Sequence, residues 1–569
     1  MLASERSGAL AGAGYCQFGY TRSNEILKWW VEIRMTNPKQ HKGNPLYRFL
    51  KLVQHGGKRM FQIAEGMANA VFGPENNPFY YLGGLSFFLL CVLVGTGIYL
   101  YLFYDANLGG AYASVERLTH EQWYLGGVMR SLHRYAADGM IVTIVLHMLR
   151  RFFNDRYNGA RSFSWITGVP MLWIVLVIGL LGYWLVWDKM AQFIVVRSFE
   201  WLDWLPIIAE PVARNFLTNT TTTDTLFRLV MVTHLGLPLF LMAAVLLHTN
   251  RLHQPKINPH WRLCAGTLLA LLILSFIKPA LSHAPADLSV EPGVLHLDWF
   301  YLAAYPLVTL WPAGMVWLLI GGGTVLLIAL PWLPPKRRDP VAAVDLTSCF
   351  GCNLCVEDCP YEAIRLAPRT DAHPRFHYEA QVIDDKCVSC GICTGSCPKS
   401  APLHHAEALK SAIEMPQAGI QGLRDNVLGV LQQGTGEKRV VVFGCEHGID
   451  VTQLGQPGIA GVNLECIGLL PPSFIDYTLR QGADGVFITG CRMGDCYHRL
   501  GNKLLQQRLD GERQPKMPPR VAPERVGFLM AAEADQKTLL HELETFYRSL
   551  PASDAAGDGR RREKGNINR

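Results

Sequence analysis

Residues 130–151 read RSLHRYAADGMIVTIVLHMLRR, an apolar stretch of helical length that carries two histidines and begins and ends with arginine. His133 and His147 are 14 residues apart. This is nearly four helical turns, so both side chains project from one helix face, about 21 Å apart. A histidine inside a membrane-spanning helix is unfavourable unless it has a function. The stretch therefore predicts a membrane helix with two ligand positions, one above the other.

The same interval recurs elsewhere in the apolar half of the chain. His234 and His248 are also 14 residues apart, so two helices can hold two flat cofactors between neutral imidazoles. Haem fits because ligation by two histidines leaves no open coordination position and suits electron transfer. Two glycine pairs keep this interval, Gly83 with Gly97 and Gly168 with Gly182. A glycine lets a porphyrin edge approach the backbone closely, so the pairs support two stacked haems.

Six apolar stretches approach the length of about 20 residues that a membrane span requires. They cover residues 80–104, 130–152, 168–187, 227–249, 262–281 and 306–333. Basic residues follow the second, fourth and sixth stretches, and the loops after alternate spans lie on the same side of the membrane. The positive-inside rule makes that side cytoplasmic. They are Arg150, Arg151, Arg156, Arg161, Arg251, Lys256, Arg262, Lys336, Arg337 and Arg338. We expect an all-α transmembrane bundle in the inner membrane of a prokaryote, with both chain ends in the cytoplasm.

Composition separates this apolar half from a soluble remainder. The chain has 569 residues, of which 49% are hydrophobic and 18% charged, and a net charge of +6. That charge is too small and too dispersed to indicate nucleic-acid binding. Residues 1–45 lack the apolar segment of a signal peptide. Twelve of the 15 cysteines lie in the soluble half, eight of them in two Cys-x-x-Cys runs that favour metal ligation over disulfides. The other three (Cys16, Cys91 and Cys264) are interpreted as structural.

The clearest metal-binding pattern lies at residues 349–398. Its cysteines are Cys349, Cys352, Cys355 and Cys359, followed by Pro360, and Cys387, Cys390, Cys393 and Cys397, followed by Pro398. This is the bacterial two-cluster ferredoxin pattern, in which the fourth cysteine of each run ligates the other cluster. A structural zinc site would not need it. One [4Fe-4S] cluster is expected on Cys349, Cys352, Cys355 and Cys397, and a second on Cys387, Cys390, Cys393 and Cys359.

A second cysteine group follows a helical connector at residues 404–437. Strands are expected at 439–445, 462–467, 485–491 and 525–530, and helices near 472–481, 498–509 and 533–548. This alternation predicts a small α/β domain with a mainly parallel sheet. Ligands gather at strand ends of open sheets, so Cys445, Cys466, Cys491 and Cys496 are expected to converge. Four thiolates fit either a [2Fe-2S] cluster or a zinc ion.

The membrane half resembles the cytochrome b of bc and bf complexes over residues 25–333. The motifs are YYLGG at 80–84, RSLHR at 130–134 and GYWLVWD at 182–188. The resemblance implies that His133 pairs with His234 around an outer haem b, and His147 with His248 around a cytoplasmic-side haem b. It implies that Arg130, Arg134, Arg150 and Arg251 neutralise haem propionates. It also allows a homodimer through this part.

The same resemblance implies two quinone sites. The family has Pro-Glu-Trp-Tyr where this chain has Leu297-Asp298-Trp299-Phe300, so Asp298 is the candidate proton acceptor of an outer site. An ordinary loop carboxylate beside aromatic interface residues is the alternative. His253 matches a histidine at the inner quinone site of mitochondrial-type proteins, although a solvated loop histidine fits equally well.

The C-terminal part resembles the delta subunit of methyl-viologen-reducing hydrogenase. The motifs are Phe443-Gly444-Cys445, Glu465-Cys466 and GCRMGDCYH at 490–498. The resemblance implies a [2Fe-2S] cluster that passes electrons to heterodisulfide-reductase-type flavoproteins. The family usually has a second cysteine three residues after the first, where this chain has Gly448, so the ligand set stays open.

These parts predict a membrane subunit of a multi-subunit oxidoreductase. It would transfer electrons between quinone and a cytoplasmic flavo-iron–sulfur partner, either heterodisulfide-reductase-like or NAD(P)H-oxidising, because the chain has no nucleotide or flavin motif of its own. The cytoplasmic-side haem is expected nearest the ferredoxin-like insert. Quinol oxidation that splits electrons at an outer site is one alternative, and a redox sensor or membrane anchor is another. The expected segments are 1–79, 80–333, 334–344, 345–403, 404–437, 438–550 and a disordered tail at 551–569.

Overall fold

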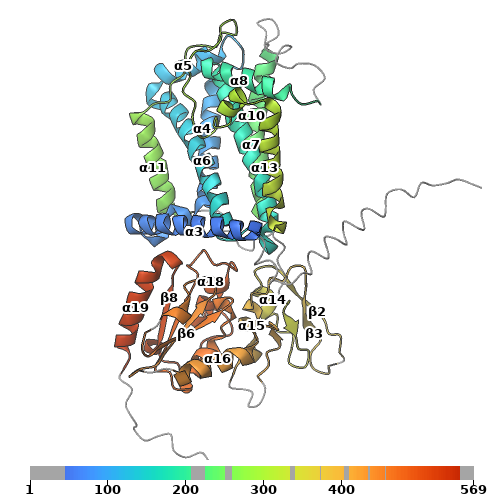
Figure 1. Cartoon of the computed structure of the whole chain (residues 1–569), viewed down its shortest axis with the longest axis vertical. Coiled ribbons are helices and arrows are strands. Elements are labelled where there is room, and N and C mark those ends of the chain that lie inside the picture. Colours follow the sequence, from blue (N-terminus) through green and yellow to red (C-terminus); the bar gives the residue numbers. More distant parts are fainter. Residues whose placement is uncertain are drawn as a thin grey trace, which may run out of the picture.

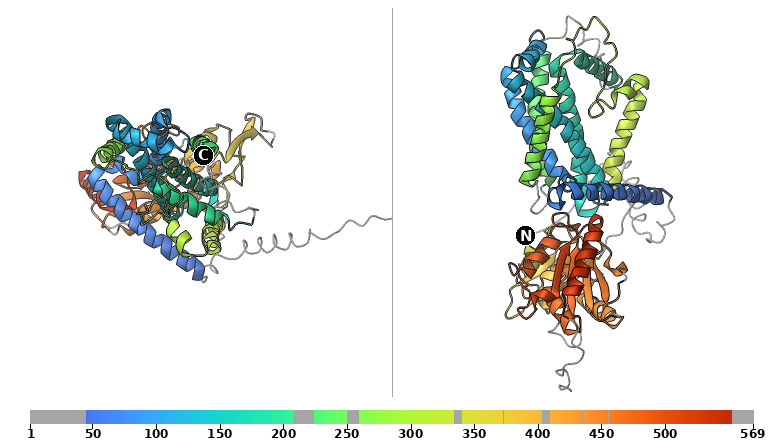
Figure 2. Two further views of the ribbon diagram at one scale, coloured as in Figure 1. Left: turned by 90° about the horizontal axis from the view of Figure 1, so that it is seen from above. Right: turned by 90° about the vertical axis from the view of Figure 1, so that its left-hand side faces the viewer.

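The computed structural model places a bundle of helices above two smaller domains (Figure 1). The structure describes residues 45–206, 224–249, 259–333, 340–371, 373–402, 409–433, 436–454 and 456–551. A long helix, α3 (Pro45–Phe72), lies crosswise between the bundle and the domains in two views (Figures 1 and 2). We call the end of the bundle next to α3 the domain-facing end.

The bundle is built from long apolar helices joined by short ones. The long helices are α4 (Leu82–Phe103), α6 (Val128–Phe153), α7 (Ser162–Val186), α10 (Asp224–Thr249), α11 (Trp261–Ile277) and α13 (Ala313–Ala329). Between them lie α5 (Ala111–His120), α8 (Lys189–Leu202) and α12 (Tyr305–Leu310). Leu89 of α4, Met140 of α6 and Ile178 of α7 belong to one buried core. That core holds α4, α6 and α7 together, and it also includes Leu241 of α10.

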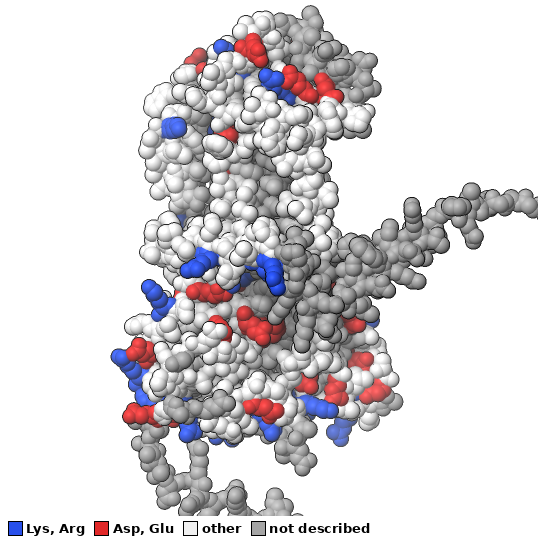
Figure 3. Space-filling model, viewed as in Figure 1, with Lys and Arg blue, Asp and Glu red and all other residues white. Residues whose placement is uncertain are grey.

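Four of the described helices are long and apolar enough to cross a membrane, namely Leu82–Phe103, Ser162–Val186, Asp224–Thr249 and Ala313–Trp332. Helices also form at the other two predicted spans, but α6 carries several charged residues and α11 has only 17 residues. By length and composition the predicted number of six spans is therefore not confirmed. On the face that Figure 3 shows, the described part of the bundle has few charged side chains between its ends, as an integral membrane protein requires.

Helix α3 is amphipathic and has the character of a helix at a membrane surface. Phe49, Leu52, Met60, Ile63 and Met67 recur at helical spacing and are exposed in this chain. Such an apolar stripe, beside a polar face, lets a helix lie in the plane of the interface. The polar face of α3 contacts the C-terminal domain, as described below.

The ferredoxin-like domain is formed by two small antiparallel sheets and two short helices. Strand β1 (Ala343–Val344) pairs with β4 (Ile413–Glu414), and β2 (Ile364–Pro368) pairs with β3 (Tyr378–Val382). Helices α14 (Leu354–Glu357) and α15 (Ile392–Ser396) each carry a cysteine of the two runs. Gly351 and Gly391 have φ values of 69° and 73°, which lets the chain turn tightly just before each helix.

The C-terminal domain contains a four-stranded parallel sheet in the order β6-β5-β7-β8. Its strands are β5 (Val440–Cys445), β6 (Ile459–Leu464), β7 (Gly485–Gly490) and β8 (Val526–Met530). Its helices are α16 (Ile420–Gln433), α17 (Pro472–Arg480), α18 (Gly501–Leu509) and α19 (Gln536–Ser549). The prediction of an α/β domain with a mainly parallel sheet is confirmed. Strand β6 begins three residues earlier than expected and ends before Cys466, so that cysteine lies beyond the strand.

Candidate electron-transfer centres

The four predicted histidines lie in two facing pairs between α6 and α10. The ring centres of His133 and His234 are 6.4 Å apart. An iron bound to one nitrogen of each ring, at about 2 Å as in metal–imidazole bonds, would hold the ring centres about 6 Å apart. His147 and His248 lie close enough to interact electrostatically. The spacing of the first pair therefore fits a haem iron between its two rings.

Hydrogen bonds at Nδ1 fix the orientation of three of these histidine rings. The Nδ1 atom of His133 lies 2.9 Å from Thr96 Oγ1, and Nδ1 of His248 lies 3.0 Å from Thr167 Oγ1. Both threonine hydroxyls donate to carbonyl groups of their own helix, so their oxygens are left to accept from Nδ1–H. Nδ1 of His234 donates to the carbonyl oxygen of Ile178 at 3.0 Å. A proton on Nδ1 leaves the Nε2 lone pair available for iron.

Sequence reasoning did not identify Thr96 and Thr167. A signal was present, because each directly precedes a glycine of the 14-residue repeat, in the pairs Thr96-Gly97 and Thr167-Gly168. In both pairs the threonine bonds the histidine ring and the glycine leaves room for it.

The four repeated glycines each lie against one histidine ring. A Cβ atom placed on Gly97 would be 3.3 Å from Cε1 of His133, and one on Gly182 would be 3.2 Å from Cε1 of His234. Gly83 faces His147 at 3.0 Å, and Gly168 faces His248 at 3.4 Å. We expected a porphyrin edge to approach these glycines. The observed neighbours are the imidazoles, which the glycines allow to lie close to α4 and α7.

The described arginines expected at the propionates have partners within the protein. Arg134 pairs with Asp298 at 2.9 Å and with Asp138 at 3.4 Å. Arg130 bonds Ser282 at 2.8 Å and Thr119, and lies 3.6 Å from Glu116. Arg150 pairs with Glu65 and with Asp495, both at 2.8 Å. Arg251 and His253 lie outside the described residues.

Asp298 joins the loop before α12 to the bundle. Its carboxylate accepts hydrogen bonds from Arg134, from the hydroxyl of Tyr183, and at 2.8 Å from the backbone N–H groups of Phe300 and Tyr301. These contacts anchor the turn 298–301 to α6 and α7. The geometry thus favours the alternative of a structural carboxylate over an acid held ready for quinol.

The ferredoxin-type cysteines gather in the two predicted sets. Cys349, Cys352, Cys355 and Cys397 line one hollow together with apolar side chains. Burial raises the pKa of the Cys355 thiol to about 12, and the neighbouring thiols of its set add to this. In the other set, burial raises the pKa of Cys390, with contributions from Cys393, Cys359 and Cys387. Such thiols ionise readily only beside a strong cation, which the iron of a cluster would supply.

The four C-terminal cysteines converge at the carboxyl ends of the parallel strands, and all are buried. Sγ of Cys445 lies 3.6 Å from Sγ of Cys491, and Cys466 contacts Cys496. Two thiolates on one tetrahedral metal, with bonds of about 2.3 Å, are about 3.7 Å apart. This spacing fits iron and zinc alike. A Cβ on Gly448 would lie 3.3 Å from Sγ of Cys445, so the position of the additional family cysteine faces the same group.

The loop that carries Cys496 contacts the domain-facing end of α6. Asp495 pairs with Arg150 at 2.8 Å and with Arg156, and Arg161 donates to the backbone carbonyl of Tyr497. Burial alone would raise the pKa of Asp495, but Arg150 and Arg156 more than offset this and hold it well below its usual range. We expected the cytoplasmic-side haem nearest the ferredoxin-like insert. At this end Arg150 and Arg156 pair with the cysteine loop of the C-terminal domain, and Tyr361 of the ferredoxin-like insert lies close enough to Arg161 to interact electrostatically.

Helix α3 and an aromatic residue strengthen this junction, which we call the haem-helix junction (residues 150–161 with 492–497). The Arg492 guanidinium lies 4.1 Å from the ring centre of Tyr80, just before α4, within the range of a cation–π contact. Lys58 and Asn69 of α3 bond Glu533 at 2.5 Å and Asp535 at 2.8 Å. The C-terminal domain is therefore held against the bundle by many charge-assisted contacts.

The fold and these sites define a membrane-bound electron-transfer protein with haem-binding helices and iron–sulfur domains. The chain belongs to the cytochrome b family, whose model (cytochrome b/b6/petB) matches residues 68–256. It is 31% identical over 150 residues to cytochrome b6 of Tupiella akineta, covering 26% of this chain and 69% of that protein. It is 24% identical over 297 residues to cytochrome b of Rhodospirillum rubrum, covering 46% and 72%.

Two further family models match the soluble half. The 4Fe-4S dicluster domain matches residues 348–401, and the delta subunit of methyl-viologen-reducing hydrogenase matches residues 440–552. Among solved structures, a hyperthermophilic respiratory Complex III covers 46% of this chain and 78% of its own, at 20% identity and a TM-score of 0.38. The predicted family resemblances are confirmed, and the chain is a membrane electron-transfer subunit with haem b and iron–sulfur domains.

Proposed function

We propose that this chain exchanges electrons between membrane quinone and a cytoplasmic flavo-iron–sulfur partner. Two b haems, two [4Fe-4S] clusters and one [2Fe-2S] cluster would supply one-electron transfer along the chain. The haem-helix junction is the observation that carries this proposal. It ties the helix of His147 to the loop of Cys496 through Asp495, Arg150 and Arg156.

The contacts support one order of cofactor sites. His147 and His248 lie nearest the C-terminal cysteines, because His147 precedes Arg150 by less than one helical turn. Cys390 of the second ferredoxin set belongs to the same buried core as Cys466 and Cys496. The first ferredoxin set comes last, and its Cys352 is exposed. We place the docking surface of the soluble partner there.

The domain–domain contacts support this order of the clusters. Arg508 of α18 is fully buried and bonds Asp358, beside Cys359, at 2.6 Å. Arg499 donates to the backbone carbonyl of Pro360 at 2.7 Å. A buried ion pair resists separation strongly once formed. The two iron–sulfur domains would then keep a constant spacing during electron transfer.

The proposal also assigns the cytoplasmic end of the bundle and the direction of electron transfer. Arg150, Arg151, Arg156 and Arg161 lie at the domain-facing end, and the positive-inside rule makes that end cytoplasmic. Ferredoxin-type clusters tend toward low potential, which favours electron flow from the soluble partner toward quinone. The partner would be heterodisulfide-reductase-like or NAD(P)H-oxidising.

A redox titration of the purified complex, followed optically and by EPR, tests the proposal. We expect two b-type haem transitions and three cluster signals, and haem reduction when menaquinol or ubiquinol is added. Zinc in place of the C-terminal cluster, or haems that stay oxidised with both quinols, would contradict it. Acid-labile sulfide in the same sample distinguishes a [2Fe-2S] cluster from zinc at the C-terminal cysteines, because only the cluster adds two sulfides to the eight of the two [4Fe-4S] clusters.

The second candidate function, quinol oxidation at an outer site, makes a different prediction for Asp298→Asn. Since Asp298 is already bonded to Arg134 and to two backbone N–H groups, we expect this variant to keep quinone-linked haem reduction within about twofold. Its stability should fall by about 1–3 kcal/mol, the usual effect of losing hydrogen bonds to a charged group. Loss of quinol-driven haem reduction in a variant that still binds both haems would favour the outer site instead.

A further inference from the structure

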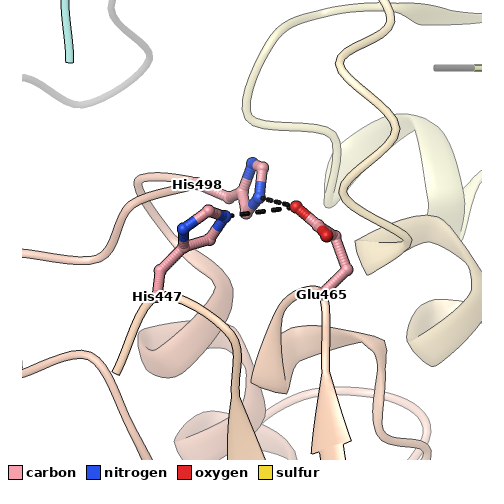
Figure 4. Close-up of side chains that lie close together, drawn as sticks. All are labelled: His447, Glu465 and His498. Atoms are coloured by element: carbon pink, nitrogen blue, oxygen red, sulfur yellow. Dashed lines mark hydrogen bonds and ion pairs between the residues drawn. The ribbon is translucent and has the colours of Figure 1, made fainter. Parts of the chain in front are cut away.

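Two histidines and one glutamate of the C-terminal domain lie close together (Figure 4). His447 follows β5, Glu465 follows β6, and His498 lies in the loop after β7. Nε2 of His447 is 3.2 Å and Nε2 of His498 is 3.1 Å from the same oxygen, Oε1 of Glu465. All three potential ligand atoms lie within 4.8 Å of one another. Neither family resemblance assigned a role to these residues.

These spacings match those of a metal coordination shell. In a tetrahedral site with metal–nitrogen and metal–oxygen bonds of about 2.0–2.1 Å, neighbouring ligand atoms are about 3.3 Å apart. The two measured contacts, 3.2 and 3.1 Å, are close to this value. Small shifts of the side chains would let one ion replace both hydrogen bonds.

The burial of the three residues leaves one side of the group open. The side chain of His498 is 5% exposed, whereas those of His447 and Glu465 are 27% and 35% exposed. An ion at this position would be bound by protein on one side and reachable by water on the other. Two histidines and one carboxylate with an open position are typical of Zn²⁺ and Fe²⁺ sites.

Stacking orients the more exposed histidine. The ring of His447 lies on the ring of Tyr497, with centres 3.6 Å apart and planes 18° apart. The Arg161 guanidinium lies 5.1 Å from the centre of that tyrosine ring. Tyr497 thereby holds His447 in position, since an aromatic pair restrains both rings. Pre-orientation of this kind is what a ligand histidine needs.

The geometry points to a mononuclear site for a divalent transition-metal ion, Zn²⁺ or Fe²⁺, formed by His447, Glu465 and His498 and separate from the cysteine site. Each ligand lies within two residues of one of the cysteines Cys445, Cys466 and Cys496. The ion would therefore connect the three loops that carry the cysteine site. This inference is independent of which partner or quinone the chain uses.

Metal analysis of the full-length holoprotein tests the site. In [2Fe-2S] and [4Fe-4S] clusters iron and acid-labile sulfide are equal in number, so iron beyond haem and sulfide reports a separate site. We expect one zinc or one excess iron per chain in the wild type. Glu465→Gln and His498→Gln should lose it. The matched variants Glu542→Gln and His541→Gln, on the exposed side of α19, should keep it.

A rebinding experiment gives a readout that does not depend on how the variants fold. Dialysis of the wild-type holoprotein against EDTA should remove the ion while haem and cluster spectra stay unchanged. Added Zn²⁺ should then bind once per chain, measured by calorimetry, and Glu542→Gln should behave alike. No extra metal in the wild type together with no Zn²⁺ binding after EDTA would overturn the proposal. Metal that Glu465→Gln and His498→Gln retain in full would overturn it as well.

Discussion

Replacing His133 by leucine is expected to leave the purified protein with one haem instead of two. Ligation by two histidines holds the iron from both faces, and in this chain the second face would be left to His234 alone. Leucine also fills the space next to Gly97, where the imidazole lies within 3.3 Å of the Cβ position. The pair His147 and His248 shares no ligand with this site, so its haem should remain.

Haem content per chain and an optical redox titration measure this outcome. The variant should show half the pyridine haemochrome absorbance of the wild type and a single b-type transition. His120→Leu serves as the matched control, because His120 is 64% exposed and bonds only a neighbouring glutamate on α5 among the described residues. A variant that still binds two haems would show that His133 is not an iron ligand.

Thr96→Val should produce a smaller change at the same site. Both haems should be retained, because all four histidines remain. Without the Thr96 oxygen, the Nδ1–H group of His133 loses its acceptor, and the imidazole becomes a weaker electron donor to iron. We expect the midpoint potential of that haem to rise by up to about 60 mV, equivalent to a tenfold change in relative affinity for the two oxidation states.

The site residues that are predicted best from sequence are those whose positions follow from a regular spacing along one helix or strand. A spacing of 14 residues brings two side chains to one helix face whatever the rest of the fold does, so the histidine positions follow from residue numbers alone. The same holds for the cysteines that end the strands of a parallel sheet. Cys445 and Cys491 meet at 3.6 Å although 46 positions separate them, because parallel strands end at one edge.

Contacts between domains could not be predicted from local sequence patterns. Asp495 meets Arg150 across 345 positions of sequence, and no periodicity in either segment indicates the other. For the same reason we assigned Arg150 to a haem propionate and did not foresee its pairing with Asp495. His447, Glu465 and His498 were also missed, since each one taken singly is an ordinary polar residue beside a cysteine. They form a group only once the strands are placed side by side.

Asp495→Asn is expected to release the C-terminal domain from the bundle. The carboxylate lies between Arg150 and Arg156, and its loss would leave two largely buried guanidinium groups without their shared partner. Removing one member of a buried ion pair typically costs about 3–5 kcal/mol. At about 1.4 kcal/mol per tenfold, the docking equilibrium should weaken by about 10² to 4 × 10³-fold. The contacts of α3 with Glu533 and Asp535 are more exposed and should not compensate.

Hydrogen–deuterium exchange measures this release directly. Protection of residues 492–499 and of the polar face of α3 should fall in Asp495→Asn, while haem and cluster contents stay at wild-type levels. Glu524→Gln, an exposed change in the same domain, should leave the exchange pattern unaltered. Unchanged protection in Asp495→Asn would show that the ion pairs do not hold the domain.

The rate of electron transfer from the clusters to the haems should depend on the docking of the C-terminal domain, and docking should depend on pH only through the groups that hold it. In Asp495→Asn, haem reduction from the cluster side should slow by up to about 10³-fold, because the docked fraction can fall by no more than the docking equilibrium does, while quinol-driven haem reduction stays intact. The pKa of Asp495 is lowered in the folded protein, so its stabilising effect is fully present above the ordinary aspartate pKa of about 4 and is lost only as the pH falls below it. Wild-type docking should therefore be the same at pH 7 and pH 5. Undocking already at pH 5 would mean that a group with a higher pKa, and not Asp495, holds the iron–sulfur domains beneath the haem.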